Sequence, residues 1–310
     1  MLFRSNLFEV AQVASGMTSI LGDVRDLPAL ADALRAAQPQ IVFHLAAQPL
    51  VRASYEDPVT TYTTNVIGSV NLLEAARAVK SVGAIVNVTT DKCYENREWV
   101  WGYREDEAMG GYDPYSSSKG CAELVSAAYR RSFSMNIATA RAGNVIGGGD
   151  WSKDRLVPDI LAAFSDSRAV AIRRPTATRP WQHVLEPVRG YLKLAERLFV
   201  EGQQFAGPWN FGPRDEDCRT VGEVTQRLAT LWGGGASWNP DSDTHPHEAH
   251  FLKLDISKAK AMLGWEPHLS LEEGLKLTVD WHRAWRAGEN MERFTMEIGR
   301  AHVYSSHANI

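Results

Sequence analysis

The sequence predicts an α/β fold in which a doubly wound parallel sheet is followed by a smaller C-terminal domain. Three observations support this prediction. Continuous apolar runs at residues 41–45 and 84–88 are typical of strands buried on both faces. Stretches long enough for helices separate these runs, and strands that alternate with helices form parallel sheets with right-handed crossovers. After Gly147 the character of the chain changes, because aromatic, proline and arginine residues become more frequent.

The first half of the chain contains most of the predicted parallel sheet. Asp26 is placed to cap a helix that has Pro28 in its first turn. Asp57-Pro58 opens a second helix, and Pro114 begins a third. We predict strands at 17–21, 41–45, 84–88 and 137–140, and helices after Asp26, at 57–79 and at 114–133.

The second half reads as a different kind of structure. A loop of three glycines, Gly147 to Gly149, leads into it. We predict short strands at 170–172 and 209–211, and helices near 187–200, 220–232, 256–263 and 270–286. The predicted domains are therefore residues 1–147, residues 148–300, which interleave with the first domain, and a polar tail of residues 301–310.

The bulk composition excludes several classes of protein. The net charge of −4 and the absence of a long basic run argue against a nucleic-acid-binding protein. Three cysteines without metal spacing favour a reducing compartment, and no apolar run approaches a membrane span. We therefore expect a cytoplasmic protein. The histidines of residues 245–250 fit no common zinc pattern, so we expect no metal.

Tyr115 and Lys119 are the first candidates for chemistry. Positions four apart on a helix lie on one face, so the ammonium can lower the pKa of the phenol from about 10 towards neutrality. Such a phenol can take a proton from a hydroxyl while a hydride leaves the same carbon. Taken alone, the pair is more often two exposed side chains on an ordinary helix, and only the neighbouring motifs favour the chemical interpretation.

A glycine-rich loop of the Gly-x-Gly-x-x-Gly type, which would bind a pyrophosphate at a helix N-terminus, is absent from the sequence. The glycines at 147–149 are not followed by a helix at the required spacing. Only residues 1–16 precede the first strand candidate, and a complete βαβ unit needs about 30 residues. We therefore expect the sequence to begin partway into a nucleotide-binding domain.

Several motifs together resemble the extended short-chain dehydrogenase/reductase family, from about Leu7 to about Arg286. The family has a Rossmann-like nucleotide-binding domain and a smaller domain for a sugar nucleotide. The motifs are residues 22–26, 44–48, 64–66, 89–94, 115–119, 141–145 and 179–184. The clear departure from the family is the missing glycine-rich loop.

The resemblance implies a tightly held NAD that is reduced and reoxidised within one turnover. Read position by position, the adenine end would lie at Asp23 and Val24, the dinucleotide along Leu45, Ala46 and Ala47 and beside Thr64, and the nicotinamide ribose at Tyr115 and Lys119. For the alanines, tight packing of helix against sheet remains an alternative.

Within the family, Thr90-Asp91-Lys92 points to a nucleotide-sugar dehydratase whose substrate is CDP-glucose and whose product is a 4-keto-6-deoxy sugar nucleotide. The resemblance implies that Tyr115 removes the 4-hydroxyl proton and that Thr90 hydrogen-bonds the same oxygen. Asp91 would protonate the departing 6-hydroxyl, and Lys92 would remove the C5 proton or stabilise the enolate. A solvated Asp–Lys pair on a loop remains the alternative.

The family match also suggests where a CDP-sugar would bind. Guanidinium groups match phosphate oxygens, so arginines of the second half are candidates for the diphosphate. The substrate-binding candidates are Asn144, Arg155, Leu156, Arg173, Arg179, Asn210 and His250. A homodimer or higher homo-oligomer formed through the helices near 57–79 and 113–133 is expected from the resemblance. The alternative functions are another nucleotide-sugar dehydratase, a 4-epimerase or simple oxidoreductase of the same family, and an inactive remnant.

Overall fold

The computed structural model describes residues 6–243 and 249–303. Its main sheet has four parallel strands in the order β1 (Ile41–His44), β2 (Ala84–Val88), β3 (Ile137–Ala142) and β7 (Gly207–Phe211). The predicted parallel sheet is confirmed. Strands β1, β2 and β3 begin at the predicted residues, because each is a short apolar run; β2 and β3 are buried on both faces, and β1 is buried at every second residue.

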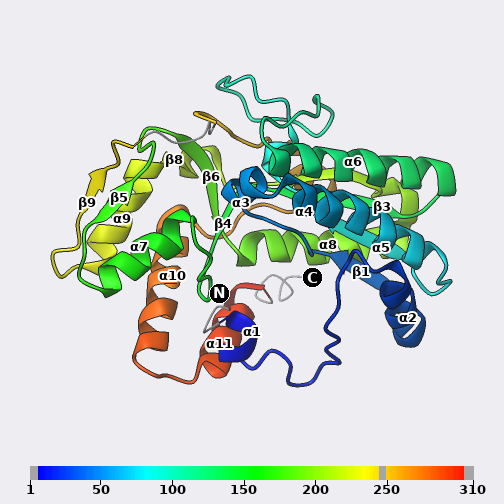
Figure 1. The fold of residues 1–310 in the computed structure, drawn as a ribbon, viewed down its shortest axis with the longest axis horizontal. Coiled ribbons are helices and arrows are strands. Elements are labelled where there is room, and N and C mark those ends of the chain that lie inside the picture. Colours follow the sequence, from blue (N-terminus) through cyan, green and yellow to red (C-terminus); the bar gives the residue numbers. More distant parts are fainter. Residues whose placement is uncertain (1–5, 244–248, 304–310) are drawn as a thin grey trace.

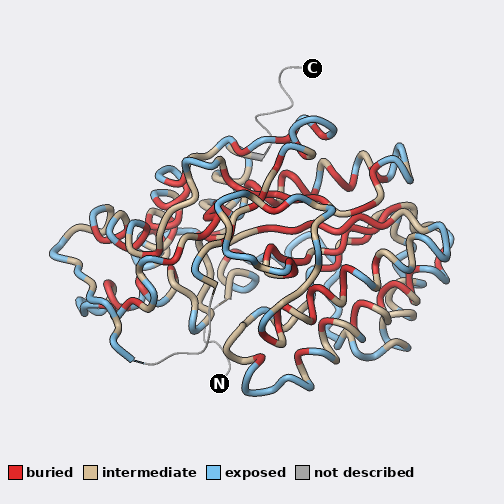
Figure 2. The backbone as a smooth tube through the Cα atoms, turned by 90° about the horizontal axis from the view of Figure 1, so that it is seen from above, coloured by how far each residue is buried: buried red, intermediate tan, exposed pale blue. Residues whose placement is uncertain are grey.

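Helices cover both faces of this sheet (Figure 1). On one face α2 (Leu27–Ala37), α5 (Gly68–Arg77) and α6 (Pro114–Phe133) pack against Val42, Ile85 and Ile137. On the other face α8 (Leu185–Glu201) packs against Val86 and Ala138. The alternating side chains of each strand therefore enter two separate cores, and Figure 2 shows the buried strands between exposed outer turns.

Helix caps fix where the first helices begin. Asp26 accepts a hydrogen bond from the amide of Ala29 at 3.0 Å, as predicted. Asp57 caps the next predicted helix, but the structure divides that helix into several segments. These are α4 (Pro58–Tyr62), a π-helical turn (Thr63–Ile67) and α5, and a further short helix, α3 (Val51–Glu56), precedes Asp57.

The second part of the fold lies beside the main sheet and contains two smaller sheets (Figure 1). One is β4 (Asn144–Ile146), β6 (Thr178–His183) and β8 (Cys218–Thr220), and the other is β5 (Val170–Ile172) with β9 (Trp238–Pro240). Helices α7 (Leu156–Ser165), α9 (Val221–Trp232) and α10 (Leu271–Arg286) share one apolar core with them. Strand β3 runs through Gly143 into β4, and β7 returns to the main sheet, so the chain passes between the two parts more than once.

Some elements differ from the prediction. Residues 17–21 form no strand, and the side chains of Ile20 and Leu21 are exposed because no strand lies beside them to pair with. The predicted helix at 256–263 is mainly a π-helical turn, Ala259–Leu263. The sequence analysis did not predict α1 (Leu7–Val10), α3, α7, α11 (Met291–Val303), β4, β6, β8 or β9. The predicted polar tail overlaps the end of α11, and residues 304–310 lie outside the described part.

Within the described ranges, no helix has both the length and the apolar composition that a membrane span requires. In the same part of the chain, no three His, Cys, Asp or Glu side chains come together as ligands for a metal ion. Residues 244–248, which include two histidines of the run considered above, lie outside the described ranges.

A buried histidine should make the fold sensitive to acid. His44 ends β1, is 5% exposed, and lies with Nε2 3.1 Å from the hydroxyl of Ser69. Burial, with a smaller contribution from the charge of Lys119, lowers its pKa from 6.5 to about 4. Between these values the unfolded chain binds a proton that the folded chain does not, so acid favours unfolding.

We therefore expect the His44 contribution to lower the free energy of unfolding by about 2 kcal/mol between about pH 7 and about pH 5. Denaturant titrations at both pH values should show a smaller drop for His44→Gln than for the unmodified chain. An equal drop in the two proteins would contradict the assignment.

Candidate active site

A cavity of about 790 Å³ lies at the carboxyl ends of β2 and β3, where parallel sheets bind ligands. Both parts of the fold form its walls. The main-sheet side supplies the ends of two strands and the start of α6, and the other side supplies β4, the start of α7 and the segment from β5 to β6. The predicted site residues that line it are Thr90, Lys92, Tyr115, Asn144, Arg155, Leu156, Arg173 and Arg179.

Tyr115 stands at the start of α6 and faces this cavity. Asp113 caps the helix through the amide and the hydroxyl of Ser116, at 2.9 and 2.6 Å, which fixes where the first turn begins. Lys119 lies one turn further, is 6% exposed, and donates to the carbonyl of Val88 at 3.0 Å. The pair is therefore buried beside the end of β2 and is not an exposed helical pair.

The predicted fall in the pKa of Tyr115 is wrong for this structure. Burial raises the pKa of the phenol to about 12, although a hydrogen bond with Thr90 opposes the rise. Burial also lowers the pKa of Lys119 to about 8, while the charge of Glu123 acts against that fall. The sequence prediction considered the spacing of the two side chains and omitted the cost of removing the phenolate from water.

Thr90, Asp91 and Lys92 form a tight turn directly after β2. Asp91 is fully buried, and its Oδ1 accepts from the Thr90 hydroxyl at 3.0 Å and from the Lys92 ammonium at 3.3 Å. The other oxygen, Oδ2, is buried and has no hydrogen-bond partner within the described structure. Buried polar atoms are nearly always paired, so this oxygen is suited to a ligand hydroxyl.

Several arginines stand on the opposite wall of the cavity. Arg173 has a weak ion pair with Asp154 at 3.7 Å, and its Nη1 is buried without a hydrogen-bond partner. Arg155 precedes α7 and its charge favours the ionised form of Tyr115. Arg179 donates to the backbone carbonyls of Thr178 and Ala249, so part of its guanidinium holds the segment around residue 249.

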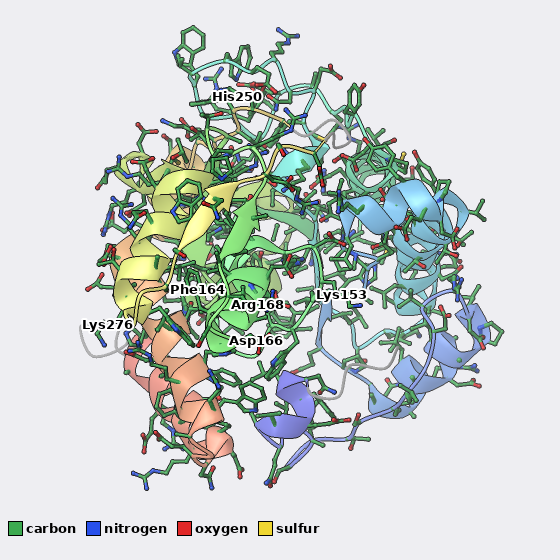
Figure 3. The ribbon with its side chains drawn as sticks, turned by 60° about the vertical axis from the view of Figure 1, so that its left-hand side comes forward. Lys153, Phe164, Asp166, Arg168, His250 and Lys276 are labelled. Carbon is green, nitrogen blue, oxygen red and sulfur yellow. The ribbon has the colours of Figure 1, made fainter. Side chains whose placement is uncertain are left out.

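Two predicted substrate contacts are corrected by the structure. Asn210 is fully buried. Its side-chain oxygen accepts a hydrogen bond from the Tyr94 hydroxyl, and its side-chain nitrogen donates to the carbonyls of Tyr103 and Asp255. The side chain of His250 is exposed and does not line the cavity, although Ala249 does. Figure 3 shows His250 at the edge of the fold, apart from Lys153, which precedes α7.

Apart from Tyr115 and Lys119, the residues predicted to bind a dinucleotide lie outside the cavity lining, at the carboxyl end of β1, in the chain that precedes α2 and, for Thr64, in the π-helical turn. Leu45 is 58% exposed, Ala46 is exposed, and Ala47 and Thr64 are half-buried. Asp23 is exposed and pairs with Arg25 at 2.6 Å, and the hydrogen bond from Arg25 lowers the pKa of Asp23 to about 2.

Side-chain hydrogen bonds connect the end of β1 to the helix of Tyr115. The amide of Gln48 donates to Asn65 at 2.8 Å, and Asn65 donates to the hydroxyl of Ser118 at 2.9 Å. Ser118 lies on α6 between Tyr115 and Lys119. The open backbone at Leu45–Ala47 therefore lies next to the Tyr–Lys pair, which fits the nicotinamide-ribose end of a dinucleotide. The described chain has no glycine-rich loop that fits the pyrophosphate.

The sequence analysis overlooked a buried ion pair behind the site, between Glu123 on α6 and Arg141 on β3. The positions of the two residues in the sequence could have indicated this ion pair. Arg141 follows an apolar strand, and Glu123 lies four residues after Lys119, which places it on the same helix face.

The parallel sheet, the Tyr–Lys pair at its carboxyl edge and the arginine-lined cavity define an extended short-chain dehydrogenase/reductase. The chain belongs to the GDP-mannose 4,6 dehydratase family, whose model matches residues 4–205.

Two relatives of this chain are 4,6-dehydratases of nucleotide sugars. The chain is 56% identical over 295 residues to the CDP-glucose 4,6-dehydratase of Salmonella typhimurium, covering 92% of this chain and 82% of that protein. It is 30% identical over 278 residues to a dTDP-glucose 4,6-dehydratase of Streptomyces antibioticus, covering 87% of this chain and 78% of the relative.

Solved structures of similar proteins share the fold. A dTDP-glucose 4,6-dehydratase of Streptomyces venezuelae, solved as a double mutant with NAD bound, matches with a TM-score of 0.79 and 26% identity over 90% of this chain and 84% of that one. The UDP-glucose 4-epimerase of Thermotoga maritima, solved with UDP-glucose, matches with a TM-score of 0.75 and 27% identity over 86% and 84% of the two chains.

Proposed function

We propose that this chain is an NAD-dependent lyase that converts CDP-glucose into CDP-4-dehydro-6-deoxyglucose and water. One observation carries the proposal: the turn after β2, in which the buried carboxyl of Asp91 lies 3.3 Å from the Lys92 ammonium, brings Thr90 and Lys92 to the cavity that Tyr115 also lines. The similarity to a CDP-glucose 4,6-dehydratase supports the choice of substrate.

The side chains divide the reaction between them. NAD, when bound, would accept a hydride from C4 of the sugar and return it to C6. Tyr115 takes the proton of the 4-hydroxyl, and Thr90, on the neighbouring turn, hydrogen-bonds the same oxygen. The hydrogen bond with Thr90 and the charge of Arg155 act against the rise that burial causes in the pKa of Tyr115.

The elimination step uses the turn after β2. This step requires the proton of the Asp91–Lys92 pair to lie on Asp91. Lys92, as the neutral amine, then removes the proton from C5, which the 4-ketone has made acidic, and Asp91 protonates the 6-hydroxyl, which leaves as water. The buried, unpaired Oδ2 of Asp91 supports this role. The product regains a hydrogen at C6 and a proton at C5, so the atoms balance with the loss of one water.

A 4-epimerase is the main alternative, since UDP-sugar 4-epimerases share the fold. An epimerase has no need of an acid and a base at C5 and C6. The contact of 3.3 Å between Lys92 and Asp91, inside the cavity wall, therefore favours a dehydratase.

The sugar-nucleotide preference is a direct test. The purified chain should contain NAD and should turn over CDP-glucose with a kcat/KM about 100-fold or more above that for dTDP-glucose or GDP-mannose. The measurement is product formation with the mass loss of one water and without added reductant. Equal turnover of dTDP-glucose would contradict the substrate, and a chain without NAD or turnover would contradict the activity.

A homodimer or higher homo-oligomer stays a prediction. Exposed apolar side chains on the face of α4 to α6, such as Val59 and Leu124, favour it, and light scattering would test it.

A further inference from the structure

The ion pair between Glu123 and Arg141 lies directly behind the catalytic residues. The two side chains are 5% and 3% exposed and meet through two hydrogen bonds of 2.9 Å. Burial by itself raises the pKa of Glu123, but Arg141 and two threonine hydroxyls more than offset this, so the pKa lies below its usual value. The carboxylate is therefore charged and fully engaged.

Glu123 joins the two segments that carry the chemistry. It lies on the helix face of Tyr115 and Lys119, eight and four residues further along α6. Its Oε1 accepts from the hydroxyl of Thr89 at 2.5 Å, and its Oε2 accepts from the hydroxyl of Thr139 at 2.6 Å. Thr89 directly precedes the turn of Thr90, Asp91 and Lys92, so one carboxylate connects that turn to the helix.

Arg141 holds the other end of the same turn. Its Nη1 donates to the hydroxyl of Tyr94 at 2.7 Å and to the carbonyl of Glu105 at 3.0 Å. The Tyr94 hydroxyl donates in turn to Asn210 at 2.7 Å. The turn is thus bracketed, since Thr89 on one side and Tyr94 on the other both bind the ion pair.

We propose that the Glu123–Arg141 pair is a positioning device that holds Thr90, Asp91 and Lys92 at a fixed distance from Tyr115 and Lys119. Neither member of the pair lines the cavity, so both act through other residues. The catalytic consequence rests on the proposed function. An error of about 1 Å in the placement of reacting groups can cost about 100-fold in rate, so a pair that fixes two segments together affects turnover.

Two matched substitutions separate positioning from stability. Thr89→Val and Thr139→Val each remove one hydroxyl that donates to Glu123, without a change in size, but only Thr89 adjoins the turn. Because Thr89 also lines the cavity, the kinetic result is read together with the substrate-free exchange measurement below. We expect Thr89→Val to lower kcat for CDP-glucose by about 10- to 100-fold with KM unchanged, and Thr89→Ser to restore it. Thr139→Val should keep kcat near that of the unmodified chain while losing similar stability in denaturant.

Hydrogen exchange provides a readout that needs no substrate. Amides of residues 89–94 should exchange faster in Thr89→Val than in the unmodified chain, and at the normal rate in Thr139→Val. Faster exchange in both variants, or in neither, would overturn the proposal. An unmodified chain that fails to turn over CDP-glucose would contradict the proposed function alone, because the exchange comparison still decides the role of the pair.

Discussion

Replacing Tyr115 by Phe should lower kcat for CDP-glucose by about 100- to 10,000-fold, because the phenol oxygen that takes the 4-hydroxyl proton is lost. Without the 4-ketone the C5 hydrogen is not acidic. The variant should therefore also fail to exchange that hydrogen with D₂O, which mass spectrometry of the recovered CDP-glucose would measure.

Tyr129→Phe is the matched control on the same helix. Its hydroxyl lies 3.2 Å from Glu74, and the residue does not line the cavity. This variant should keep both turnover and exchange. Retention of exchange by Tyr115→Phe would show that another group takes the proton.

Replacing Asp91 by Asn should lower kcat by a similar factor, about 100- to 10,000-fold, for a different reason. The amide has nearly the same shape but cannot donate a proton to the departing 6-hydroxyl. Because Tyr115 and Lys92 remain, C5 of the substrate should still exchange its hydrogen with D₂O. The expected signature is thus exchange without dehydration.

Lys92→Met should give a different result from Asp91→Asn, because the base that removes the C5 proton is lost. Neither exchange at C5 nor product is expected. If Asp91→Asn loses exchange as well, then Asp91 acts before the elimination or is needed to hold Lys92, and the assignment of the acid is wrong. Thermal unfolding of each variant would separate loss of chemistry from loss of fold.

The sequence was sufficient for the parts of the structure that depend on local pattern. β1, β2 and β3 are apolar runs, and Asp26 caps α2 because a side-chain oxygen can reach the amide three residues on. Strand β6 was not predicted because its residues, Thr178–His183, are mostly polar and acquire their burial only from neighbouring elements.

Properties of the site that depend on tertiary contacts could not be predicted from the sequence. The pKa of Tyr115 depends on burial, and the position of Asn210 depends on Tyr94, which is distant along the chain. The prediction of a strand at 17–21 was wrong. A strand needs a neighbouring strand to pair with, and no local sequence pattern shows that one is present.

The passage of β3 into β4 has a mechanical consequence. At the junction, a Cβ on Gly143 would meet Pro180 of β6 at 2.5 Å, so the backbones of the two sheets are in close contact there. The close approach at Gly143 leaves little room for this wall of the cavity to shift beside Asn144. We therefore expect a substrate of different size to be accommodated by the facing wall, at the start of α7.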